Sequence, residues 1–356
     1  MNRRVTACVL VLLTLSLAIA PRLRALELRE GLVRMELDET NGTFSLYYLA
    51  DIAANRYIPL FFAQDPETSG IAVLEDNRFH RLGESGGFTL ETVETRDGGR
   101  FIWESSTLEI IEDFSFVASR GSRLANGVQL TVTVVNRSEE TKNVGVRVLI
   151  DTTLGESQPA HFLVNGTDEV IREEGISSAS FWVSPAATNP GLGLHYSLSG
   201  DGVSRPDRVV FANWKRLIES SWEYPVRDSR TFSLLPYSIN DSAAAMYYGP
   251  RRVAPGERFT VVTAFGSAGS GAFAATGTPS GALESLFRDT DTQAVGGQMS
   301  TVEEVIAVND LLAEIDSLLS QEGGPSPEDV EVVRRIYEEL RRRADTARTG
   351  RGERSE

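Results

Sequence analysis

Hydrophobic and polar residues alternate with a period of two over most of the chain between positions 26 and 266. Residues 32–37 alternate, residues 38–42 have the composition of a turn, and residues 43–49 resume the alternation with aromatic side chains, which predicts an antiparallel hairpin. The same pattern recurs at residues 88–95, 100–103, 108–118, 128–136, 144–151, 243–248 and 259–265. This spacing predicts a mainly β fold, a large antiparallel β-sandwich over residues 26–266.

Two of these runs carry a more detailed prediction. The strand at residues 144–150 is apolar except for Arg147, which indicates one buried face and one partly hydrated face. Residues 243–248 and 259–265 flank a turn at residues 254–257, and this arrangement predicts a hairpin that closes the sandwich.

The hydrophobic period changes from two residues to about seven near position 300. A Ser-Thr cap at residues 300–301 begins the first helical pattern, Gly323 and Gly324 end it, and Ser326-Pro327 begins a second. The sequence therefore predicts a linker at residues 267–299, a helical hairpin at 300–346 and a disordered tail at 347–356. The apolar stripe of the hairpin is the predicted docking surface, and it comprises Val305, Val308, Leu312, Ile315, Leu319, Val333, Tyr337 and Leu340.

The first 25 residues have the layout of a secretory signal peptide. Arg3 and Arg4 precede an uncharged apolar run at residues 5–20, and small and polar residues follow it. This pattern predicts an exported protein, periplasmic or associated with the cell envelope, and an uncleaved signal anchor is the alternative. Cys8, which is the only cysteine, lies inside this run, so a mature chain would contain no disulfide and no thiol.

Charge and motifs exclude several classes of function. A net charge of −15 disfavours nucleic acid and anionic membranes as partners, because both attract basic surfaces. The sequence contains no phosphate-binding loop, no dinucleotide-binding glycine motif and no zinc-binding His-Glu-x-x-His motif. We therefore expect no cofactor and no metal ion.

The stretch that begins at Asp151 contains the best candidates for catalysis. Asp151 and Glu156 flank a turn, and His161 follows closely. Two carboxylates in this arrangement could act as general acid and base, or the three groups could hold a divalent cation. The alternative is structural, because an aspartate at a strand end commonly accepts hydrogen bonds from the amides of its own turn.

A second candidate site combines aromatic and charged residues. Trp214, Trp222 and Tyr224 lie close together in the sequence, and Arg216 lies between them. Aromatic faces stack on sugar rings and the arginine can bond hydroxyl groups, so the cluster could bind a glycan. The alternative is that these aromatic residues fill the core of the sandwich.

Two stretches carry a resemblance to a known group of proteins. Residues 144–156, reading VGVRVLIDTTLGE, and residues 241–250, reading DSAAAMYYGP, with Pro255-Gly256-Glu257 after them, resemble segments of a loosely defined group of exported bacterial β-sandwich proteins. The resemblance implies a sandwich fold and an exported location, but no activity. This chain has Glu156-Ser157-Gln158 where that group usually has Asn-Asp-Gly. By analogy of fold alone, the architecture is also similar to the large mutarotase-like sandwiches.

These observations support two functions. The first is a non-enzymatic envelope protein that uses the sandwich as a scaffold and the helical tail to bind another envelope protein or a second copy of itself. The second is a carbohydrate-binding or sugar-processing sandwich that uses the aromatic cluster and the carboxylates. The absence of a catalytic motif favours the first and disfavours an enzyme.

Overall fold

The computed structural model describes residues 25–62, 64–119, 122, 124–187, 192–200, 202–268 and 273. Across these residues the fold is mainly β with antiparallel sheets, which confirms the predicted class. The signal segment as far as residue 24, the helical hairpin, the tail and nearly all of the linker lie outside the described residues. No helix among the described residues has the length and apolar character needed to cross a bilayer.

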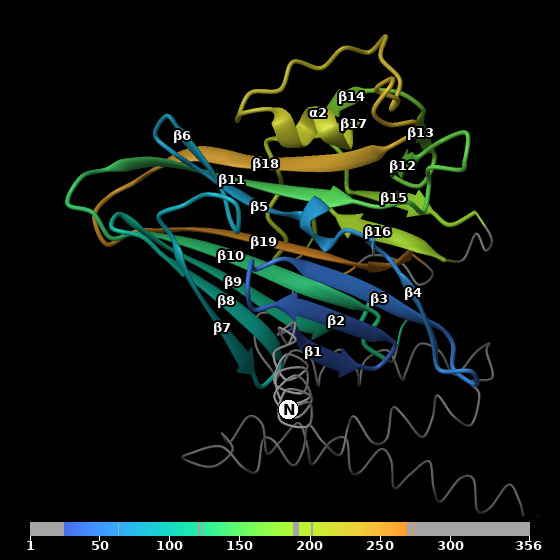
Figure 1. Ribbon diagram of the computed structural model, residues 1–356, viewed down its shortest axis with the longest axis horizontal. Helices are drawn as coiled ribbons and strands as arrows, with labels where there is room; N and C mark the ends of the chain where they lie inside the picture. The colour runs from blue at the N-terminus through green and yellow to red at the C-terminus, as the bar shows by residue number, and fades with distance from the viewer. Residues whose placement is uncertain are drawn as a thin grey trace, which may run out of the picture.

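The strands form three sheets, which Figure 1 shows as layers. The four-stranded sheet has the order β1 (Ala25–Glu30), β2 (Val33–Asp38), β3 (Phe44–Asp51) and β4 (Arg56–Pro59). The nine-stranded sheet has the order β13 (Asp168–Val170), β12 (Phe162–Val164), β15 (Phe181–Pro185), β16 (Gly193–Ser197), β19 (Arg258–Ser267), β10 (Gly127–Asn136), β9 (Leu108–Val117), β8 (Gly98–Glu104) and β7 (Thr89–Thr95). The six-stranded sheet has the order β14 (Glu174–Ile176), β17 (Arg208–Asn213), β18 (Ser242–Val253), β11 (Lys142–Asp151), β5 (Gly70–Glu75) and β6 (Arg78–Arg81).

One continuous hydrophobic core joins the three sheets. Strand β11 contributes Val148 and β10 contributes Val132, both fully buried, while Phe44 of β3 packs on Phe114 of β9 with ring centroids 5.0 Å apart. Burial of this apolar area is the main force that holds the layers together.

The β2–β3 hairpin is confirmed, and its turn has a clear local cause. The Asp38 carboxylate accepts a hydrogen bond from the Thr40 amide at 2.7 Å, and β2 pairs with β3 antiparallel. Gly42 has a φ of 65°, and a Cβ there would overlap the ring of Trp103. Glycine is therefore required at this position by both conformation and space.

The predicted closing hairpin at residues 243–265 is wrong. Strand β18 pairs with β11 and β17, whereas β19 pairs with β10 and β16, so the two strands belong to opposite sheets. The intervening turn crosses between layers instead of joining neighbouring strands. A crossover of this kind and a hairpin have the same local pattern, because both join two alternating runs through a short turn.

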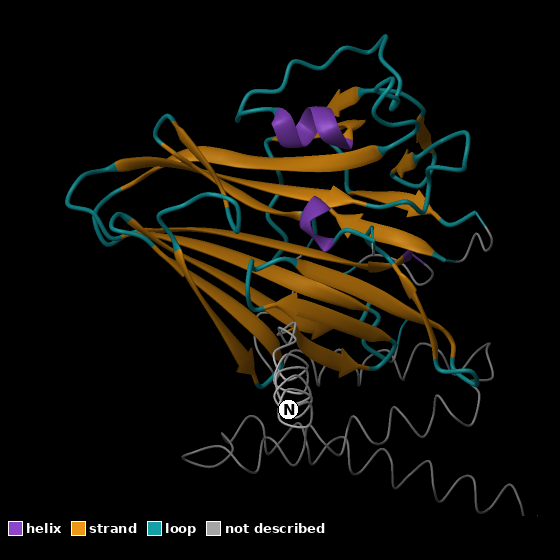
Figure 2. Cartoon of the chain, in the orientation of Figure 1, coloured by secondary structure: helices purple, strands orange, loops and turns teal. Residues whose placement is uncertain are grey.

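Helical structure is limited to short segments among the described residues. The 3-10 turn η1 (Pro66–Thr68) precedes β5, and helix α2 (Trp214–Glu219) follows β17. The sequence pattern did not predict α2, which begins because the side chain of Asn213 accepts a hydrogen bond from the Arg216 amide. Figure 2 shows α2 lying over the outer face of the six-stranded sheet.

Helix α2 and the residues around it bury the outer face of β11. Leu149, Leu217 and Tyr224 belong to a second apolar cluster there, which is separate from the core between the sheets. Arg147 lies on this face and is only 1% exposed, so the predicted partly hydrated face is in fact covered.

Candidate functional site

Three carboxyl groups converge where β11 ends and β18 begins. Asp151 is the last residue of β11, Glu156 lies in the turn after it, and Asp241 directly precedes β18. One oxygen of each carboxyl group lies within 4.8 Å of the corresponding oxygens of the other two. The antiparallel pairing of β11 with β18, in which Asp151 lies opposite Ala243, brings these distant parts of the sequence together.

Hydrogen bonds from the surrounding chain fix the position of each acidic residue. The Ser242 amide donates to Glu156 Oε1 at 3.0 Å, and the side chain of Thr68 bonds to the carboxyl group of Asp151. The side chain of Asn213 donates to the backbone carbonyl of Asp241 at 3.0 Å and to Ser238 Oγ at 2.9 Å. The cluster is therefore held by the 3-10 turn η1, strand β17 and the loop before β18.

Burial is the main cause of the raised pKa values of the three carboxyl groups. Burial, with the charge of Asp241 as a smaller cause, raises the pKa of Asp151 to about 8 and that of Glu156 to about 7. Burial also raises the pKa of Asp241. Because neighbouring carboxylates cannot all ionise, the three groups share protons at neutral pH and titrate as a unit.

His161 is connected to the cluster through Ser242. Its Nδ1 lies 2.8 Å from Ser242 Oγ, and its ring lies 4.5 Å from that of Phe232. The imidazole is almost completely buried, and burial lowers its pKa. It is therefore neutral at pH 7, and its contact with Ser242 helps to position the amide that bonds to Glu156.

The aromatic residues predicted to form a glycan platform lie in different places. Trp214 is half-buried, and its Nε1 donates to the Thr68 carbonyl at 2.9 Å, which places it beside the carboxyl cluster. Trp222 packs edge-on against Tyr247 at 5.4 Å, and the Tyr224 hydroxyl contacts Glu173.

Arg216 is likewise directed into the protein. Its guanidinium donates to the carbonyls of Thr231, at 3.1 Å, and Ser233, at 2.8 Å. Of the predicted platform, the structure thus brings Trp214 to the carboxyl groups and places Trp222, Tyr224 and Arg216 in contacts with other parts of the chain.

Asp241 is the functional candidate that the sequence prediction missed. It directly precedes the apolar strand β18, whereas Asp151 ends the apolar strand β11. An antiparallel pairing of the two strands would have identified Asp241 as a candidate, because antiparallel neighbours place the start of one strand beside the end of the other.

The arrangement permits two kinds of chemistry. A shared proton among closely spaced carboxyl groups provides both a general acid and a general base. Alternatively, oxygens within 4.8 Å of one another can bind one divalent cation, since a calcium ion lies about 2.4 Å from each oxygen ligand.

Comparison with solved structures finds similar sandwiches at low identity. A galactose mutarotase related enzyme from Lactobacillus acidophilus matches with a TM-score of 0.44 and 10% identity, covering 71% of this chain and 100% of that one. A putative aldose 1-epimerase from Escherichia coli K12 matches with a TM-score of 0.43 and 9% identity, covering 68% and 98%. An alpha-N-acetylgalactosaminidase from Bifidobacterium bifidum matches with a TM-score of 0.39 and 11% identity, covering 76% and 39%. No protein-family model and no curated protein sequence matches this chain.

The fold and the site together define a class: a three-sheet antiparallel β-sandwich with a carboxyl cluster at one end of its six-stranded sheet. Mutarotase-like and other carbohydrate-active proteins are among its structural neighbours. At these identities and TM-scores the function has to be argued from the site itself.

Proposed function

We propose that this protein binds a carbohydrate and carries out acid–base chemistry on it with Asp151, Glu156 and Asp241. The observation that supports the proposal most strongly is the proximity of three carboxyl groups whose pKa values burial has raised toward neutrality. A group with a pKa near the working pH is the most efficient proton donor or acceptor.

The burial of each group suggests its role. Asp151 is 3% exposed and lies beneath the other two, so it would retain the shared proton. Glu156 and Asp241 are partly exposed and are the groups that a sugar can contact. One would donate a proton to a ring or glycosidic oxygen while the other removes a proton from a hydroxyl group, which is the division of labour that sugar chemistry requires.

The test is a comparison of carboxyl variants in sugar binding and turnover. We expect glycan-array screening to find a ligand, and we expect Asp241→Asn and Glu156→Gln to slow its conversion, or the exchange of its anomers, by about 10²- to 10⁴-fold. Glu169→Gln, an exposed residue on β13, is the matched control. If no glycan binds and no anomeric exchange is accelerated, the proposal fails.

A divalent cation site is the second candidate, and the spacing of the carboxyl oxygens favours it. If the cluster holds calcium, addition of the ion should raise the melting temperature of the wild type and leave that of Glu156→Gln nearly unchanged. Stabilisation by calcium without any glycan binding would replace the carbohydrate proposal with a cation site.

The docking role of the helical tail and the exported location stay predictions. The proposed partner is another envelope protein, or a second copy of the chain, bound through the stripe from Val305 to Leu340. If a chain truncated after Gly266 remains in every complex that the full chain forms, the tail does not dock.

A further inference from the structure

Arg147 is a buried cation whose contacts are all with neutral groups. It lies on the outer face of β11, and its Nη1 donates to the Leu217 carbonyl at 3.2 Å and to Ser220 Oγ at 3.4 Å. Its guanidinium also lies 4.5 Å from the centroid of the Phe79 ring. The side chain has no ion pair within the described part of the chain, and its Nε has no hydrogen-bond partner there.

A second arginine approaches the same place from β6. Arg81 Nη2 donates to the Ser220 carbonyl at 3.5 Å, and Arg81 Nη1 lies 3.3 Å from Glu84 Oε2. The Nε of Arg81 also has no hydrogen-bond partner among the described residues. After burial, the charge of Arg81 is the main influence that lowers the pKa of Arg147.

Arg147 has no carboxylate partner among the described residues. Glu84 pairs with Arg81 and more than half of its side chain is exposed to water, while Glu67 lies on the opposite wall of the adjoining cavity, where Asn41 Nδ2 donates to its Oε1 at 3.0 Å. A buried charge without a counter-ion is unfavourable, and hydrogen bonds to carbonyl and hydroxyl oxygens compensate for it only in part. A negative charge placed at Arg147 would give its guanidinium the ion pair that it lacks.

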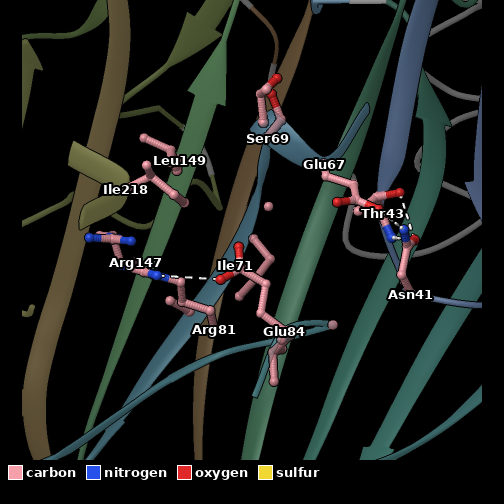
Figure 3. Close-up of a pocket in the computed structure, with 16 residues that line it drawn as sticks. Asn41, Thr43, Glu67, Ser69, Ile71, Arg81, Glu84, Arg147, Leu149 and Ile218 are labelled. Atoms are coloured by element: carbon pink, nitrogen blue, oxygen red, sulfur yellow. Dashed lines mark hydrogen bonds and ion pairs between the residues drawn. The ribbon is translucent and has the colours of Figure 1, made fainter. Parts of the chain in front are cut away.

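A cavity of about 70 Å³ adjoins both arginines. Figure 3 shows Arg147 and Ile218 on one side of it and Asn41, Thr43 and Glu67 on the other. A space of this size has room for a small anionic group with a few water molecules, since one water needs about 10–15 Å³ measured in this way. The hydroxyl and amide groups of Thr43, Ser69 and Asn41 give the cavity a polar wall.

A second cleft, which is open to solvent, adjoins the cavity. A cleft of about 400 Å³ is lined by Phe79, Arg81, Glu84 and the serines at positions 85, 220 and 221. Arg81 and Glu84 line both spaces and thus stand between them. An exposed ion pair contributes little to stability, so an entering anion can replace Glu84 at Arg81 at low cost.

We propose that Arg147 and Arg81 bind the carboxylate of an acidic sugar. A carboxylate would supply the ion pair that Arg147 lacks, and its planar geometry matches the fork of a guanidinium group. Hydroxyl groups of the sugar would face Thr43, Ser69 and Asn41. This inference deepens the proposed function and rests on it for the sugar itself.

The proposed carboxylate site at Arg147 and the carboxyl cluster at Asp151 lie on the same strand. Arg147 and Asp151 lie on the same face of β11, four residues apart, which is a separation of about 13 Å along the strand. Ser69 links the two places, because it lines the cavity and its Oγ accepts a hydrogen bond from the Asp151 amide at 2.9 Å. An acidic unit at Arg147 and the unit at the carboxyl cluster could therefore belong to one oligosaccharide.

The test measures the preference for an acidic over a neutral sugar by calorimetry, with glucuronate, glucose and acetate as the probes. We expect glucuronate to bind at least about tenfold more tightly than glucose, and acetate to compete with it, because charge-assisted bonds to arginine are strong. The preference should disappear in Arg147→Met and in Arg81→Gln. Arg81→Gln keeps the test valid if Arg147→Met does not fold, and Arg251→Gln, an exposed arginine paired with Asp207, is the control.

Each outcome separates this inference from the proposed function. Equal affinity for glucuronate and glucose, or a preference that survives both arginine substitutions, would overturn the inference even if neutral sugars are converted. A preference that depends on the arginines and persists in Glu156→Gln would support it, even if no sugar is converted. Displacement of glucuronate by acetate would support recognition of the carboxylate, and a failure of acetate to displace it would overturn the inference.

Discussion

The two faces of strand β11 are both buried but carry different chemistry. Val146, Val148 and Ile150 face the other sheets and are completely buried among apolar side chains. The alternate residues Arg147 and Asp151 are almost as fully buried, but they lie beneath helix α2 and the loop before β18. The first face stabilises the fold, whereas the second buries ionisable groups at a cost in stability.

The difference indicates where function lies. Apolar burial contributes free energy in proportion to area, whereas buried ionisable groups lower stability unless they are paired. Groups such as Arg147 and Asp151, which reduce stability where an apolar residue would raise it, are expected at functional sites. The comparison can be tested with substitutions on each face.

The largest effect is expected in the core between the sheets. Phe114→Ala removes a ring that packs against Phe44 at 5.0 Å and Phe101 at 5.7 Å, and it should lower the free energy of unfolding by about 3–5 kcal/mol. Denaturant unfolding is the measurement. Phe116→Ala, a partly buried position on the same strand, is the control and should cost less than half as much. Equal losses of unfolding free energy in the two variants would contradict the placement of Phe114 in the core.

A smaller effect is expected at Glu112, the ionisable exception within that core. Burial raises the pKa of Glu112 to about 8, and the bond from Trp103 Nε1 at 2.9 Å opposes the rise. The folded protein thus retains a proton that the unfolded chain releases, so this group makes stability fall as the pH rises from about 4.5 to 8.

By pH 7 this group has lowered the free energy of unfolding by about 3 kcal/mol relative to its value below pH 4.5, at 1.36 kcal/mol per pKa unit. Glu112→Gln should remove that part of the slope of unfolding free energy against pH and be more stable than the wild type at pH 8. Unfolding measured across this pH range provides the check, and an unchanged slope would show that Glu112 does not titrate as described.

The smallest effect is expected on the outer face. Gly145 lies against Trp222, and an added Cβ would come within 2.5 Å of the ring. Gly145→Ala should therefore destabilise by about 1–3 kcal/mol, as overpacking does. In the background of Trp222→Ala the same change should cost much less, because the obstructing ring is gone, and a double-mutant cycle of unfolding free energies measures this coupling. Additive effects would contradict the contact.

Part of the site could be predicted from the sequence and part could not. Asp151 and Glu156 were candidates because they lie close together in the chain, and their proximity in space follows from one short turn. Asp241 was missed because its proximity depends on the pairing of β11 with β18, which no local pattern encodes. Trp214 and Trp222 look equivalent in the sequence, yet the first lies beside the carboxyl cluster and the second packs on Gly145 and Tyr247.

The sequence by itself determined the strands with clear alternation, which are β2, β3, β7 to β11, β18 and β19, but not the shorter strands β4 to β6 and β12 to β17. A period of two records which residues alternate between the faces of a sheet. The antiparallel hairpin of β2 and β3 also followed from local turn chemistry. Tertiary structure alone decided that β18 and β19 enter opposite sheets, that α2 covers the outer face, and that Arg147 and Asp151 are buried there. The physical reason is that alternation depends on neighbours in the chain, whereas pairing and burial depend on contacts between residues far apart in it.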